Sequence, residues 1–142
     1  MSQSLIIALP THLTLDSIAA SLATSGLIFT RGATSIQLLR DATRYVDIGP
    51  MKEPAAAIDD YSSNEDLPEK FRAEVRKCSL RIVYFNDFHL AKATLETVLA
   101  NLGDALARSW IDSDYGWVMA AEQFLARLQA GWDWRVRSPA SS

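Results

Sequence analysis

Three groups of side chains in this sequence could do chemistry, and the first is a pair of closely spaced aspartates. Asp112 and Asp114, in the stretch DSDYG at residues 112–116, match the first and third ligand positions of a calcium-binding EF-hand loop. Such a loop also needs glycine at its sixth position and glutamate at its twelfth, whereas here Gly116 is fifth and Gln123 is twelfth. We therefore expect no metal site and predict a β-turn, because Asp, Ser and Gly favour tight turns.

The second group is the single cysteine and the two histidines. Cys78 and His89 could be paired as a nucleophile and its base, and His12 is the other histidine. Neither histidine has another at metal-ligand spacing, and the sequence has no G-x-S-x-G elbow and no glycine-rich phosphate loop. Cys78 continues the apolar stripe of a short charged helix predicted over residues 68–78, which favours a packed thiol. The sequence thus indicates no enzyme and no cofactor.

The third group is aromatic, since all four tryptophans lie in the last third of the chain, at Trp110, Trp117, Trp132 and Trp134. Across a hairpin the first two would lie near one another, and in an extended segment the last two would share one face. Packing is the main expectation for all four.

A partner-binding surface is the alternative for the same region, because Trp and Tyr combine a large contact area with a polar group. Asp112, Asp114, Tyr115 and Trp117 are the residues that we predict for this surface. Tyr115, at the turn, is the one that we most expect to be exposed.

Residues 52–67 differ in composition from the rest of the chain, with Pro54, the triplet SSN and four carboxylates in the pairs DD and ED. This composition predicts a linker or an exposed loop. The carboxylates are Asp59, Asp60, Glu65 and Asp66. They are either solvated or a docking site for a basic partner, because acidic patches speed association with basic proteins.

Apolar periodicity indicates the elements that must position these groups. Long apolar runs predict two buried strands, and each is followed by an amphipathic helix. Shorter strands and a final helix complete the pattern. The strands are predicted at 4–9, 27–30, 35–41, 43–49, 79–85, 108–112 and 116–120, and the helices at 11–26, 68–78, 86–104 and 120–131.

This order predicts a single α+β domain over residues 1–142, with an antiparallel or mixed sheet packed by helices in a ferredoxin-like manner. Residues 1–50 and 79–135 both run strand, helix, strand, strand, and residues 51–78 join them as an acidic linker and a short helix. The two halves are either a duplication or a chance likeness of common elements.

Composition narrows the class of function. The 142 residues include 14 Lys and Arg against 17 Asp and Glu, for a net charge of −3. Neutralising phosphates supplies most of the affinity of nucleic-acid binders, so we expect no nucleic-acid partner. The apolar run at 4–9 is too short for a membrane helix, and one cysteine suits a reducing cytoplasm.

The stretch WIDSDYGWVMAAEQFLARLQAGWDWR, residues 110–135, resembles small bacterial proteins encoded beside toxins. The shared features are an acidic D-x-D-Y/F-G turn, a short strand, a helix with F-L and a final W-D-W. The resemblance implies a compact cytoplasmic α+β immunity protein that neutralises one cognate toxin by occluding it. An acidic inhibitor of this kind would fill a basic cleft in the toxin.

Two other functions stay open. The first is a regulatory module, such as a phage-encoded inhibitor or an adaptor that binds another protein. The second is an enzyme that uses Cys78 or a hidden Asp/His site. The sequence does not indicate an oligomeric state.

Overall fold

The centre of the fold is an antiparallel pair of strands, β1 (Gln3–Pro10) and β5 (Cys78–Phe85), which confirms the two predicted buried strands. This computed structural model describes residues 3–114 and 116–135. The pair is in register from Gln3 opposite Phe85 to Pro10 opposite Cys78. Both faces of the pair are covered at the end where Pro10 lies opposite Cys78. This burial explains why each strand sequence is an almost continuous apolar run.

Five shorter strands extend this pair into one seven-stranded sheet, in the order β2-β3-β4-β5-β1-β6-β7, with all neighbours antiparallel. The added strands are β2 (Phe29–Arg31), β3 (Ile36–Leu39), β4 (Tyr45–Pro50), β6 (Trp110–Asp112) and β7 (Val118–Ala120). In this order β4 and β1 run parallel on either side of β5, and β5 and β6 run parallel on either side of β1. That split β-α-β arrangement is the ferredoxin-like core, so the α+β prediction is confirmed.

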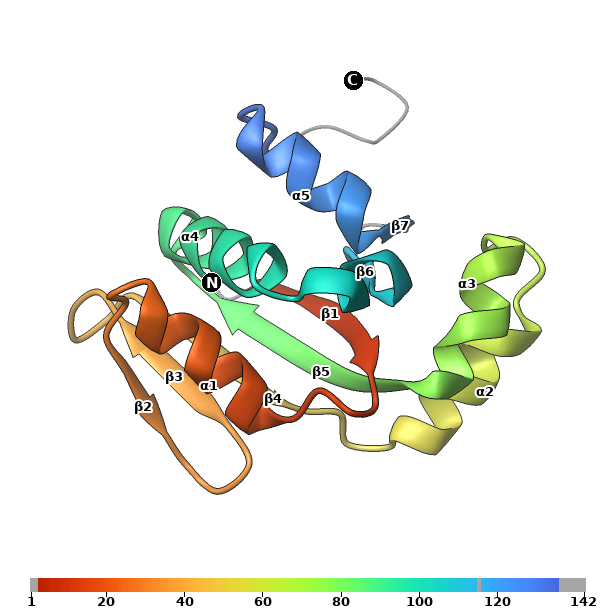
Figure 1. Cartoon of the computed structure of the whole chain (residues 1–142), viewed down its shortest axis with the longest axis horizontal. Helices are drawn as coiled ribbons and strands as arrows, with labels where there is room; N and C mark the ends of the chain where they lie inside the picture. Colours follow the sequence, from red (N-terminus) through yellow and green to blue (C-terminus); the bar gives the residue numbers. More distant parts are fainter. Residues whose placement is uncertain (1–2, 115, 136–142) are drawn as a thin grey trace.

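Three helices cover one face of the sheet: α1 (Leu15–Thr24), α4 (Phe88–Ala100) and α5 (Ala121–Gln129) (Figure 1). Their apolar stripes meet the side chains of β1 that point the same way, Leu5, Ile7 and Leu9, in the main core. Polar residues cap two of these helices. Thr14 begins α1, and Asp87 begins α4, where its side chain accepts a hydrogen bond from the backbone N–H of Leu90.

The opposite face is covered at one end by α2 (Pro54–Ser63), α3 (Glu69–Glu74) and a short 3-10 helix, η1 (Val75–Lys77). They enclose a second, smaller core made of Ala8, Phe71, Val75, Cys78, Leu80 and Trp110. Our prediction of a linker or exposed loop over 52–67 was therefore wrong for residues 54–63. Ala57, Ile58 and Tyr61 recur at helical spacing and pack on this core, and tertiary contact overrides the turn-like composition.

One further expectation needs correction. The helix predicted over 86–104 ends at Ala100, and Gly103, with φ +59°, begins a separate 3-10 helix, η2 (Gly103–Arg108). Both halves begin β-α-β-β, as predicted, and then differ, because the first continues with β4 and the second with α5. Whether they arose by duplication stays a prediction.

Candidate functional site

The stretch DSDYG forms the turn of the β6–β7 hairpin, as the sequence predicts. The backbone N–H and the hydroxyl of Ser113 both donate to the carbonyl of Trp117, at 3.1 and 3.2 Å. Asp114 and Gly116 both have positive φ, +64° and +90°, in keeping with the residue types that tolerate it. Tyr115, which we expected to be exposed, lies outside the described residues.

The two aspartates of the turn differ in their surroundings. Asp112 is half-buried, and its carboxylate accepts a hydrogen bond of 2.5 Å from the hydroxyl of Tyr61 on α2. Burial, this hydrogen bond and the charges of Asp112 and Asp114 raise the pKa of Tyr61 far above its ordinary range. Asp114 is exposed, and its carboxylate accepts a hydrogen bond of 3.1 Å from Ser4. The Tyr61–Asp112 bond links α2 to the turn, and the carboxylate of Asp114 lies at the surface.

The tryptophans pack, but not as expected across the hairpin. Trp110 lies opposite Ala120 and belongs to the second core, where its indole N–H donates to Glu74. Trp117 belongs to the other face of the sheet and packs against Trp132, with ring centroids 5.4 Å apart. The prediction that Trp110 and Trp117 lie near one another was wrong. Side chains alternate between the two faces along the hairpin, and the register places these two on opposite faces. The predicted shared face of Trp132 and Trp134 is confirmed, since both pack on Phe124.

The carboxylates of the predicted acidic segment do not form one cluster with the turn. Asp59 pairs with Arg76 at 3.1 Å, so its charge is partly neutralised. Asp60 lines a shallow hollow between α2 and the sheet, and Glu65 and Asp66 are exposed in the connection between α2 and α3. Of the eight predicted partner residues, Asp114 and Asp60 thus have the best placement for reaching a partner on the sheet.

Sequence reasoning missed a part of the sheet that the helices leave uncovered. On the side facing away from α1 and α4, and beyond the end covered by α2 and α3, the strands present a set of side chains that we name the open face: Leu39, Tyr45, Asp47, Ile82 and Tyr84. Leu39 lies opposite Tyr45, and Asp47 lies opposite Tyr84. Tyr84 is 45% exposed, and Leu39, at the end of β3, is 53% exposed and also borders a hollow lined by Leu90 and Ala93 of α4.

Strand alternation places these side chains together. Val46 and Ile48 point into the main core, so Asp47 between them points the other way, and Tyr84 does the same between Val83 and Phe85. The alternating pattern is legible in the sequence of each strand. That the side chains share one surface follows from the register of β3, β4 and β5, which the sequence does not reveal.

Several carboxylates lie in or beside the open face. Asp47 lies within it, and next to Tyr84 in the sheet is Ser4, which donates to Asp114. Along α2, a hollow of about 470 Å³ is lined by Ile82 of the open face with two carboxylates, Asp60 and Glu53, and one cation, Lys52. The open face is therefore an apolar and aromatic surface with an excess of negative charge at its borders.

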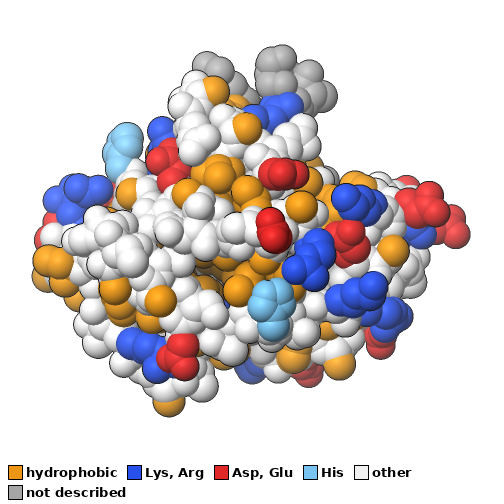
Figure 2. All heavy atoms as spheres, in the orientation of Figure 1, with side chains coloured by type: hydrophobic (Ala, Val, Ile, Leu, Met, Phe, Trp, Pro, Cys, Tyr) orange, Lys and Arg blue, Asp and Glu red, His pale blue; other side chains and the backbone are white. Residues whose placement is uncertain are grey.

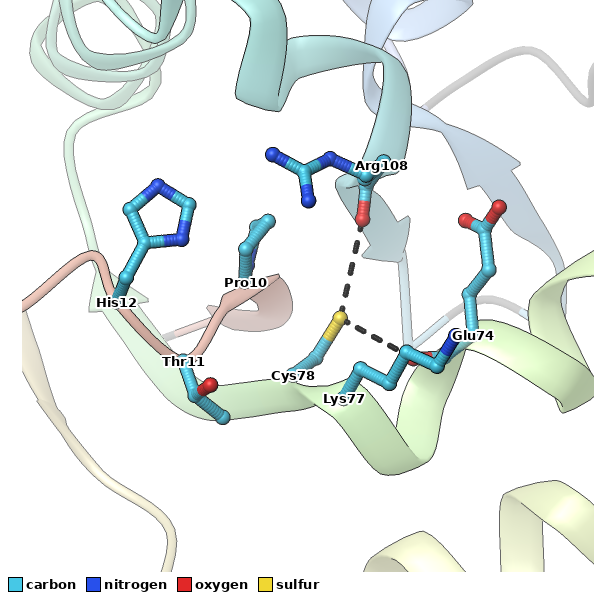
Figure 3. Close-up of a pocket in the computed structure, with 7 residues that line it drawn as sticks. All are labelled: Pro10, Thr11, His12, Glu74, Lys77, Cys78 and Arg108. Carbon is cyan, nitrogen blue, oxygen red and sulfur yellow. Dashed lines mark hydrogen bonds between the residues drawn. The ribbon is translucent and has the colours of Figure 1, made fainter.

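A separate pocket of about 240 Å³ lies at the other end of β1 and contains the reactive candidates Cys78 and His12 (Figure 3). The Cys78 sulfur lies 3.6 Å from the carbonyl oxygen of Glu74 and 3.8 Å from that of Arg108, and either oxygen can accept its S–H. Burial and the charge of Glu74 raise its pKa to about 11, although Arg108 opposes the shift. His89 is the second residue of α4 and does not line this pocket, whereas His12 does.

We predict from this geometry that Cys78 reacts slowly. At pH 8 its alkylation by iodoacetamide should be roughly a hundredfold slower than that of a thiol of ordinary pKa, because the thiolate is the nucleophile. The rate should rise about tenfold per pH unit until the pH nears 11. Mass spectrometry of the alkylated chain measures this rate, with the urea-unfolded chain as control. Equal rates for the folded and unfolded chains at pH 8 would contradict the packed thiol.

No protein-family model, curated protein or solved structure matches this chain. The likeness of residues 110–135 to immunity-type proteins therefore stays a prediction. Among residues 3–114 and 116–135, no helix combines the length and apolar character needed to cross a bilayer. Within the same residues, His, Cys, Asp and Glu side chains form no group of three or more that could hold a metal ion.

Proposed function

We propose that this protein binds a basic protein partner and neutralises it by occlusion, as an immunity protein does for its toxin. The observation that carries the proposal is the open face, on which Tyr84 and Leu39 are exposed within a border of carboxylates. Large apolar side chains exposed together mark interaction surfaces on soluble domains. Tyrosine in particular provides contact area with few rotatable bonds and a hydroxyl for hydrogen bonding.

Charge supports a basic partner. Asp47, Asp60 and Asp114 lie in or beside the open face, and the whole chain carries a net charge of −3. Negative potential of this kind increases the association rate with a basic surface and disfavours acidic partners. The lone cysteine is free and buried, which is compatible with action in a reducing cytoplasm.

The first test is co-expression. The product of the neighbouring gene is expressed in a bacterial host with and without this protein, and survivors are counted. We expect the neighbour to be lethal alone and harmless in the presence of this chain. A harmless neighbour, or killing that this protein does not relieve, would overturn the proposal in favour of a regulatory module with a distant partner.

The surface is tested with the same pair by a direct binding measurement. Tyr84→Ala is expected to weaken binding at least about tenfold, because it removes an exposed aromatic anchor. Asp47→Lys is expected mainly to slow association, more strongly at low salt. Glu122→Lys on α5 is the matched control, since it reverses an exposed charge on the helix-covered side. Loss of binding in the Glu122→Lys variant alone would mean that the partner binds the helix-covered side, which would contradict binding at the open face.

A further inference from the structure

The pocket at the end of β1 gathers cationic side chains from three separate segments. His12 follows β1, Lys77 ends η1 and Arg108 ends η2, so the sheet and its connections fix their positions independently. Figure 3 shows the imidazole of His12 and the guanidinium of Arg108 extending toward each other above Pro10, with the Cys78 thiol beneath. In Figure 2 a histidine lies near several Lys and Arg side chains, with Asp and Glu side chains among them.

These cations have no carboxylate partner among the described residues. No ion pair joins His12, Lys77 or Arg108 to a carboxylate in residues 3–114 and 116–135. Five arginines each form one, namely Arg31, Arg40, Arg44, Arg76 and Arg135, whereas Arg72, Arg81 and Arg127 resemble Arg108 in forming none among the described residues. Arg108 is thus a guanidinium with free donors over a concave site.

Glu74, the one carboxylate that lines the pocket, is engaged elsewhere. Its Oε2 accepts a hydrogen bond of 3.0 Å from the indole N–H of Trp110, and its Oε1 lies 4.0 Å from Lys70. Figure 3 shows the Glu74 side chain directed away from His12 and from the Arg108 guanidinium. The space between His12, Arg108 and Cys78 is therefore bordered by hydrogen-bond donors and positive charge.

We propose that this pocket binds a small oxyanion, a phosphate or carboxylate group, with Arg108 and Lys77 supplying the charge and His12 a further donor. Guanidinium presents paired N–H donors that match the oxygens of either group, and the ammonium of Lys77 adds charge without a fixed direction. The proposal is independent of partner binding at the open face, because Ser4 and Pro10 at the two ends of β1 are about 20 Å apart.

The test uses the full chain and inorganic phosphate, with acetate as a second probe. Binding is followed through backbone amide shifts in a two-dimensional NMR titration, at an ionic strength held constant with sodium chloride. We expect saturable shifts centred on residues 11–12, 77–78 and 108. Saturation by phosphate alone assigns a phosphate group, and saturation by acetate assigns a carboxylate. Shifts that are linear in both anions, or spread over the whole surface, would overturn the site.

Variants make the test specific. Arg108→Gln and Lys77→Gln should each weaken binding about tenfold, because each removes a charge-assisted hydrogen bond. Both side chains are exposed, so the fold is expected to persist, and the amide spectrum verifies this. Arg76→Gln is the matched control, since Arg76 precedes Lys77 but pairs with Asp59. Equal losses in the Arg76 and Arg108 variants would show general charge attraction and overturn the proposal.

Discussion

Replacing Trp134 with alanine is expected to lower the free energy of unfolding by about 3–5 kcal/mol, in the range for large aromatic residues in cores. Trp134 is 1% exposed, and its ring packs against Phe85, Phe88 and Phe124 at centroid distances of 5.7, 4.6 and 5.5 Å. Alanine would leave a cavity where α4, α5 and β5 converge. Urea denaturation followed by circular dichroism measures the loss.

Trp134→Phe is the matched control for this prediction. Phenylalanine keeps an aromatic ring among the three neighbours, and the indole N–H that it removes is buried without a partner among the described residues. Losing that N–H costs no hydrogen bond, so we expect a change of about 1–2 kcal/mol from reduced packing. A loss below about 1 kcal/mol for Trp134→Ala would show that the W-D-W segment does not pack in solution.

The strongest periodic signals predicted the correct elements. The apolar runs at 4–9 and 79–85 became β1 and β5, and the stripes that follow them became α1 and α4. These segments are long, and their burial is nearly complete on the face that the stripe defines. Periodicity is then set by the same core contacts that stabilise the fold, which makes it a reliable guide.

The α2 helix shows where this reasoning fails. Composition favours a loop, with Pro54 at the start and serines and aspartates through its second half. The helix is held instead by a few long-range contacts, among them the Tyr61–Asp112 hydrogen bond across 51 residues of sequence. A single sequence carries no signal for a contact at that distance, so composition gives the wrong answer for residues 54–63.

The candidate sites could be predicted only in part, again because long-range contacts leave no signal in a single sequence. The carboxylates Asp60 and Asp114 could be found as surface groups in the sequence, because exposed charge near turns and loops is a local property. The open face and the pocket between His12, Lys77 and Arg108 depend on which strands are neighbours. Register and topology decide both, and neither is a local property.

Replacing Phe71 with alanine tests whether the layer formed by α2 and α3 is a separate unit. Phe71 is 2% exposed and packs on Trp110 and Tyr61, with ring centroids 5.3 and 5.2 Å apart. It lies in the second core, which is smaller than the main one and on the opposite face of the sheet. We expect the free energy of opening this layer to fall by about 3–5 kcal/mol. The free energy of opening the strands should fall by less.

Native-state hydrogen exchange separates this local opening from global unfolding. Amides of residues 54–77 should exchange faster in Phe71→Ala, while those of β1 and β5 at the main core keep most of their protection. Cys78 provides a second readout, because loosening of the second core exposes its thiol, lowers its pKa from about 11 and speeds its alkylation at pH 8. Phe71→Leu, which keeps most of the apolar volume, is the control. A uniform rise in exchange across α2, α4 and β5 would contradict a separate layer, since it would mean that both cores unfold together.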